Sequence, residues 1–281
     1  MIAALLIAFR EGLEAALIVG IVLSYLKKMG YRQRAAVWWG VVSAVIVSIV
    51  AGVALQVMGV GFEGRGEQLF EGITMLLAAG VLTWMIFWMQ RQGRSIRAEL
   101  EADVRQAVTG GNRWALFALA FVAVVREGIE TALFLTAAAF SAAPMQTLIG
   151  GGLGLALAVA VGWLLFVISV RLDVRAFFRV TSVLLILFAA GLAAHGVHEL
   201  QEAGVLPVLV EHVWDINPIL DEKSAVGSVL QALFGYNGNP SLIEVVSYAA
   251  YYLMVGIAIG LGQRTGESTP EFSREAPQHL N

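Results

Sequence analysis

The sequence has 281 residues, none of them cysteine, and only a few of them charged. The lack of cysteine excludes disulfides, thiolate metal sites and thiol catalysis. Charged residues make up 14% of the chain, whereas a soluble domain has about 25%. A net charge of -3 is too small to indicate a nucleic-acid partner, and we expect none. These deficits predict a chain whose surface faces mostly lipid.

Hydrophobic residues are abundant instead, at 58%, and the mean hydropathy is +0.77. A helix needs about 20 apolar residues to cross the hydrocarbon core of a bilayer. Such runs are far too long for barrel strands, and helices satisfy their own backbone groups in lipid. The predicted fold class is therefore all-α, a polytopic membrane protein with seven transmembrane helices. The seven runs are 1–26, 35–58, 69–90, 114–140, 145–170, 176–200 and 242–262.

Basic residues predict the orientation of these helices. If the runs alternate in direction, fourteen of the 18 lysines and arginines fall on one side of the membrane. Cytoplasmic loops carry the excess of basic residues, so the N-terminus is expected outside and the C-terminus in the cytoplasm. We expect a multi-pass protein of the cytoplasmic (inner) membrane, with one permease domain, 1–262, and a disordered cytoplasmic tail, 263–281.

An internal repeat divides the hydrophobic part of the chain. Residues 10–19 read REGLEAALIV and residues 126–135 read REGIETALFL, with six of ten positions identical. The two copies lie in runs one and four, which cross the membrane in opposite directions. Segments 1–90 and 114–200 are therefore candidate inverted repeats, with the helix at 242–262 added, and transporters often place their site between such repeats.

Each copy of this motif places charges inside an apolar helix. A charge at the helix centre costs about 2.5–3.5 kcal/mol on insertion scales, so such residues indicate a function. Two arginines cannot neutralise four carboxylates, so either protons or a bound cation must supply the missing charge, and a multivalent cation does so directly. Ligands that are all oxygen favour hard cations: Fe(III) first, but also Mn(II), Mg(II) or Ca(II). Alternatively, each arginine pairs with one glutamate only to lock helix packing. The residues are Arg10, Glu11, Glu14, Arg126, Glu127 and Glu130.

The doubled R-E-G-x-E motif resembles the signature of the oxidase-dependent iron permease family, which includes fungal high-affinity iron permeases and bacterial EfeU permeases. The resemblance implies that the four motif glutamates handle iron in transit and that the two arginines shape the site. Iron is then the transported substrate, and no cofactor is expected. The resemblance also implies a periplasmic or extracellular oxidase or iron-binding partner at the outer face. An acidic motif of the fungal members has no clean copy here.

A second group of polar residues lies at the outer ends of runs three and six. A vestibule that collects cations would use such carboxylates and imidazoles, whereas interfacial residues that cap helices would give the same pattern. The sequence leaves both interpretations open. The residues are Glu67, Glu71, His195, His198 and Glu199.

The predicted function is thus an iron permease that moves iron ions inward. A permease for manganese or lead is the alternative. A membrane enzyme with carboxylate-bound iron is less favoured, since such sites use Glu-x-x-His on two helices and runs one and four contain no histidine. We therefore predict a transporter and no enzyme activity.

Overall fold

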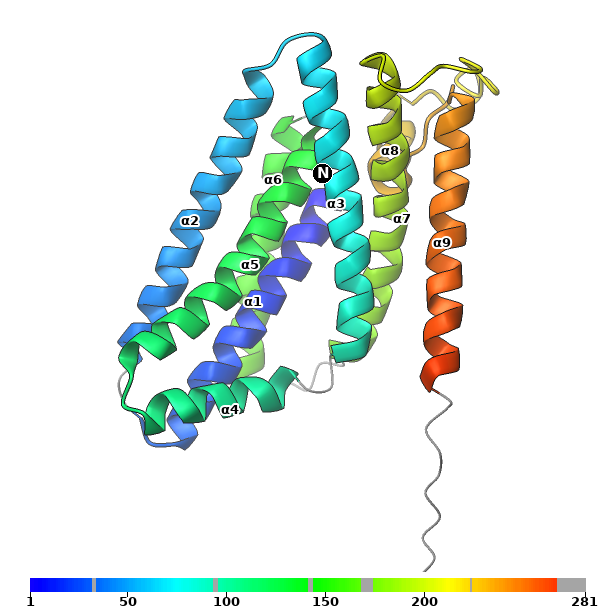
Figure 1. Ribbon diagram of the computed structural model, residues 1–281. Helices are drawn as coiled ribbons and strands as arrows, with labels where there is room; N and C mark the ends of the chain where they lie inside the picture. Colours follow the sequence, from blue (N-terminus) through cyan, green and yellow to red (C-terminus); the bar gives the residue numbers. More distant parts are fainter. Residues whose placement is uncertain (32–33, 93–95, 141–143, 168–173, 223, 267–281) are drawn as a thin grey trace, which may run out of the picture.

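The computed structural model describes residues 1–31, 34–92, 96–140, 144–167, 174–222 and 224–266, and the regular elements in these ranges are all helices (Figure 1). Seven are long and two are short. The long helices are α1 (Ile2–Lys28), α2 (Ala35–Val60), α3 (Arg65–Gln92), α5 (Arg113–Phe140), α6 (Pro144–Val167), α7 (Val174–Glu202) and α9 (Leu242–Gly266). The short helices are α4 (Ile96–Thr109) and α8 (Ala225–Phe234).

Five of the long helices are long and apolar enough to cross a membrane, namely α2, α3, α6, α7 and α9. The five apolar helices confirm the prediction of an all-helical, polytopic membrane protein. The helices α1 and α5 are 27 and 28 residues long. Each contains the three charges of one motif, which lower the hydropathy of its centre, and neither is among the five apolar helices. The count of seven crossings therefore stays a prediction.

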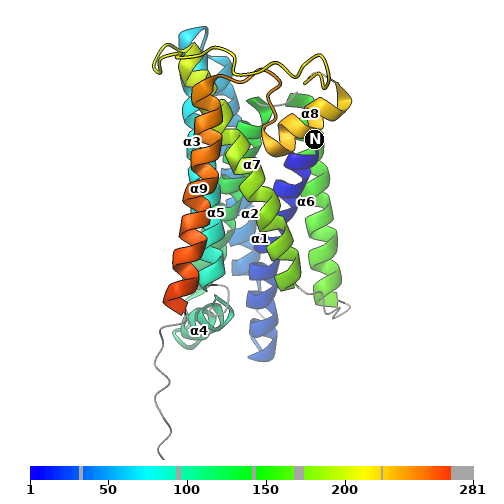
Figure 2. The ribbon, with the colours of Figure 1, turned by 90° about the vertical axis from the view of Figure 1, so that its right-hand side faces the viewer.

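Two short helices add to the predicted layout. The segment between runs three and four, expected as a loop, contains α4, which lies across the lower ends of the long helices (Figure 1). It is amphipathic, and its Val104 is fully buried in a cluster with Leu26 of α1 and Leu116 of α5. The helix α8 lies in the long segment between α7 and α9, and Figure 2 shows it beside the N-terminal end of α1. The run predicted to end at 262 continues to Gly266, and the rest of the predicted tail lies outside the described residues.

The long helices pack as three close pairs: α1 with α6, α2 with α5, and α3 with α7. Small residues spaced four apart form one ridge on each of two helices, and small side chains let backbones approach closely in membranes. On α2 the ridge contacts α5; on α6 it contacts α1. The ridges are Gly40, Ala44, Ser48 and Gly52 on α2, and Gly150, Gly154, Ala158 and Gly162 on α6.

The two motif helices lie side by side in the interior of the bundle. One apolar cluster joins them to α3, α7 and α9 through residues such as Ile7, Met75 and Phe134, all fully buried. A second cluster packs α4 against the ends of α1, α2 and α5 that lie nearest to it. With apolar side chains on both sides, the motif charges lie at the centre of the protein, not on its lipid-facing surface.

Candidate functional site

The first motif forms a compact charged group on α1. Arg10 is fully buried, and its Nη1 donates to Glu11 Oε1 at 2.7 Å. Its Nη2 lies 2.9 Å from Glu14 Oε1, one helical turn further on. The spacing of three and four residues places all three side chains within one turn of the helix. One guanidinium therefore contacts both carboxylates of its motif.

The second motif repeats this arrangement on α5 with one difference. Arg126 Nε donates to Glu130 Oε1 at 3.0 Å, whereas Glu127 Oε1 lies 3.9 Å away. Both glutamates are buried, but the arginine side chain is 34% exposed. Arg126 therefore pairs mainly with Glu130 and leaves Glu127 only weakly neutralised.

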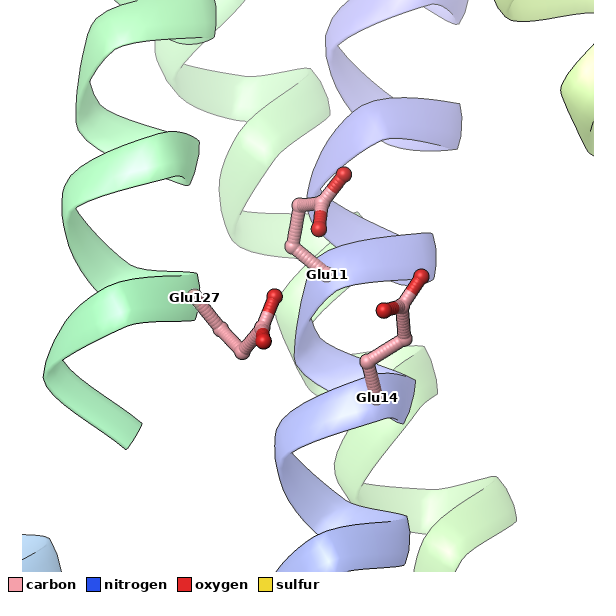
Figure 3. Close-up of side chains that lie close together, drawn as sticks. All are labelled: Glu11, Glu14 and Glu127. Atoms are coloured by element: carbon pink, nitrogen blue, oxygen red, sulfur yellow. The ribbon is translucent and has the colours of Figure 1, made fainter. Parts of the chain in front are cut away.

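Three of the four motif glutamates meet between the two helices. Glu11, Glu14 and Glu127 each offer a carboxylate oxygen, and these atoms all lie within 4.8 Å of one another. Figure 3 shows Glu127 reaching from α5 toward the pair on α1. Glu130 is not in this group, and one of its oxygens accepts a hydrogen bond from Arg126. Oxygens this close, from three carboxylates, form a candidate site for a hard cation.

The buried oxygens of this group have too few hydrogen-bond donors around them. One oxygen each of Glu11 and Glu127 is buried without a hydrogen-bond partner, and so is one oxygen of Glu130, outside the group. A buried polar atom without a partner costs free energy, and a carboxylate costs more than a neutral group. A cation bound between the oxygens would satisfy them and complete the charge balance.

The motif glycines face away from this group. A Cβ atom added at Gly12 would lie 2.9 Å from the Cβ of Ala158 on α6. One added at Gly128 would overlap the hydroxyl of Ser48 on α2. Each glycine therefore allows close contact with a neighbouring helix, so that the carboxylates are held at a fixed separation.

The predicted outer group gathers where α7 ends and where α3 and α9 begin. His195 Nε2 lies 3.7 Å from Glu199 Oε1 on the next turn of α7. The ring nitrogens of His198 face two carboxylates, Glu202 at 3.3 Å and Glu244 at 3.5 Å. Glu67 and Glu71 stand on α3, which packs against α7 at this end.

The sequence places Glu202 on the same helix face as His195 and Glu199, whereas sequence reasoning did not include Glu244 in the outer group. Gln68 donates to Glu202 at 3.0 Å, and Asn237 donates to Glu244 at 2.9 Å. The spacing of four from His198 to Glu202 was a usable signal. No such signal existed for Glu244, because α9 meets α7 only through the folding of a long loop.

Four further residues of α3 contact the motif arginines. Met85 and Met89 place their sulfur atoms 3.3 and 2.7 Å from the terminal nitrogens of Arg10. The guanidinium of Arg126 lies 4.5 Å from the ring centre of Trp88 and 6.0 Å from that of Trp84. These contacts could not be predicted from the sequence, because spacing along one helix does not show which neighbouring helix a residue faces.

The chain matches a known family over nearly its whole length. The profile of the iron permease FTR1 family matches residues 1–269. The ferrous iron permeases EfeU of Shigella sonnei and of Escherichia coli O157:H7 are both 38% identical over 264 residues, which cover 93% of this chain and 96% of theirs. The ferrous iron permease EfeU of Yersinia pestis is 37% identical over 263 residues, which cover 92% of this chain and 93% of that protein.

No solved structure matches the chain significantly. The resemblance expected from the doubled motif is nevertheless confirmed by the family profile and by the identity to these relatives. The chain belongs to the iron permease FTR1 family.

Proposed function

We propose that this protein is a permease that moves iron inward across the cytoplasmic membrane through the buried carboxylate group. One observation carries the proposal: Glu11, Glu14 and Glu127 converge within 4.8 Å inside the membrane domain, with too little positive charge to balance the motif glutamates. This group is a set of carboxylate ligands that face one another. Its chemistry is to bind and release a hard cation, and iron is favoured over manganese or lead because the relatives are named as ferrous iron permeases.

The experiment is uptake into proteoliposomes, with Fe(II), Fe(III) and Mn(II) offered separately. We expect an iron species to accumulate at the lowest concentration. Accumulation of manganese alone would assign the permease to another metal, and no accumulation of any ion would contradict the transporter.

We further propose that α1–α3 and α5–α7 are inverted repeats, with the cation site between them. Three matched contacts support this. The contact of Gly40 with the backbone of Phe117 matches the contact of Gly150 with the backbone of Met1. The contact of Gly52 with Ala132 likewise matches the contact of Gly162 with Ala16. Gly128 meets Ser48 as Gly12 meets Ala158. In each matched pair of contacts, the residue on α5 comes 116 positions after its counterpart on α1. The residue on α6 comes 110 positions after its counterpart on α2. Two copies of one three-helix unit would produce this agreement.

Seven crossings with the N-terminus outside follow from the same proposal. Lys28, at the end of α1, is then cytoplasmic, whereas Glu211 in the long loop before α8 is outside. The chain has no cysteine, so single cysteines can be introduced without background. We expect Glu211→Cys to react with an impermeant thiol reagent in intact cells and Lys28→Cys to react only after the membrane is opened. Reaction of both in intact cells would contradict this topology.

The outer group is proposed as a vestibule that concentrates cations before they enter. Its carboxylates come from three helices, and clustered negative charge at an entrance raises the local concentration of cations. Replacing His195, His198 and Glu199 with alanine is expected to raise the half-saturating iron concentration more than it lowers maximal uptake. His212→Ala, an exposed histidine in the outer loop, is the matched control. An unchanged half-saturating concentration would assign these residues to helix capping.

A periplasmic or extracellular oxidase or iron-binding protein is the proposed partner at this face. The loop between α7 and α8 supports the idea, because it exposes apolar side chains outside the helices. Leu209 is 68% exposed and Ile219 is 88% exposed. Large exposed apolar groups of this kind are typical of surfaces that bind another protein.

A further inference from the structure

The motif arginines have neutral neighbours as well as carboxylates. Each terminal nitrogen of Arg10 lies close to one carboxylate and one sulfur atom. Nη1 contacts Glu11 and the sulfur of Met85; Nη2 contacts Glu14 and the sulfur of Met89. The guanidinium therefore lies between two carboxylates on its own helix and two thioethers on α3.

Arg126 is held in a related way by the same turn of α3. Its guanidinium lies over Trp88, and Trp84 stacks on Trp88 with ring centres 6.2 Å apart. A cation over an indole face is attracted by the ring's negative face without any formal charge on the partner. Each arginine thus has anionic partners on its own helix and neutral partners on α3.

One segment of a single helix supplies all of these neutral contacts. Trp84 and Trp88 are four residues apart, as are Met85 and Met89, so each pair forms one short ridge along the helix. The two ridges are adjacent, and they face α5 and α1 respectively. We call the four residues Trp84, Met85, Trp88 and Met89 the arginine cradle.

We propose that the arginine cradle positions Arg10 when a cation takes its two carboxylates, and that it steadies Arg126 when the same cation draws Glu127 away from it. The inference rests on the proposed function, since it needs a cation at the Glu11, Glu14 and Glu127 group. A bound cation competes with the guanidinium of Arg10 for the carboxylates of Glu11 and Glu14. An arginine that lost its carboxylate with no other partner would be left as an unpaired buried charge, which is strongly unfavourable.

Neutral partners suit this role better than charged ones. A further carboxylate on α3 would hold the arginine, but it would also bind the cation and trap it. A thioether is a weak acceptor and an indole face is uncharged, so both support a guanidinium without adding a competing hard ligand. The arginine cradle therefore lowers the cost of exchanging guanidinium for metal at the carboxylates.

The test replaces the sulfur atoms while keeping the packing. Leucine has nearly the volume of methionine but no acceptor, and such swaps are well tolerated in cores. The variant Met85→Leu/Met89→Leu is compared with Met75→Leu, which changes a fully buried methionine of the same helix within the apolar cluster. Trp88→Leu is compared with Trp88→Phe, which keeps an aromatic face, and with Trp163→Leu on the exposed side of α6. Iron uptake by proteoliposomes, iron binding by the solubilised protein and its thermal unfolding are measured for each.

We expect the double methionine variant and Trp88→Leu to raise the half-saturating iron concentration about tenfold, which corresponds to about 1.4 kcal/mol. Maximal uptake and melting temperature should stay close to those of the controls, and Trp88→Phe should recover part of the loss. The cradle is refuted if these variants bind iron as Met75→Leu does, or if only maximal uptake or stability falls. A wild-type protein that takes up no iron would instead refute the proposed function, so the two failures can be told apart.

Discussion

Glu127→Gln should abolish most iron uptake, although Glu127 is the glutamate of the cation group that contacts its arginine least closely. The substitution keeps the size of the side chain and removes its charge, so only two carboxylates remain between α1 and α5. A trivalent or divalent hard cation prefers several anionic oxygens. We expect uptake to fall by at least about 10- to 100-fold, which is the loss typical when even a residue that only supports a metal ligand is replaced. Glu14→Gln on α1 should have the same effect.

The double variant tests whether the two motifs build one site. Groups that act as a unit are not additive, so Glu14→Gln/Glu127→Gln should be scarcely worse than either single variant. Removing buried charge eases membrane insertion, so membrane levels should not fall. Glu211→Gln, which changes an exposed acid of the outer loop, serves as the control. Two independent conduction paths would instead leave each single variant about half active, and only the double variant would be inactive.

Gly128→Ala should disrupt the contact between α2 and α5, which fixes where Glu127 points. The added methyl group would overlap Ser48, whose hydroxyl donates to the carbonyl oxygen of Ala44 at 2.8 Å. Overpacking a close contact costs about 1–3 kcal/mol. We expect a lower melting temperature of the solubilised protein and a loss of uptake, because the helices must separate to admit the methyl group.

Compensating variants make this prediction specific. Ser48→Gly should restore the stability of Gly128→Ala, since it removes the atoms that the methyl group meets. If the repeats are related as proposed, Gly12→Ala should be destabilising and Ala158→Gly should rescue it in the same way. Gly80→Ala on α3 is the control, because an added Cβ there meets nothing within 4 Å. An equal effect of Gly80→Ala and Gly128→Ala would show that helix flexibility, not the contact with Ser48, is what matters.

Much of the fold could be predicted from the sequence. Long apolar runs have one stable form in lipid, so the ranges of the seven long helices follow from composition and length alone. The motif charges were identifiable for the same reason, since a charge inside such a run is conspicuous. The contacts of Arg10 with Glu14 and of Arg126 with Glu130 were also predictable, because residues four apart on a helix lie on one face.

Other features arise only between helices and could not be predicted from spacing. The sequence assigned the four motif glutamates to one site with equal weight, whereas the fold brings Glu11, Glu14 and Glu127 together and turns one oxygen of Glu130 toward Arg126. The sequence alone also does not show that Gly12 and Gly128 each make room for a neighbouring helix.

The sequence by itself determined that this is a helical membrane protein with two buried acidic motifs, because helix periodicity fixes contacts within each helix. Only the tertiary structure decided which carboxylates meet, which helix the glycines touch, and that Met85, Met89, Trp84 and Trp88 hold the arginines. The physical reason is that a helix can rotate about its axis without changing its internal hydrogen bonds. The side that a helix turns toward its neighbours is set by packing against other helices, here by the small-residue ridges of α2 and α6.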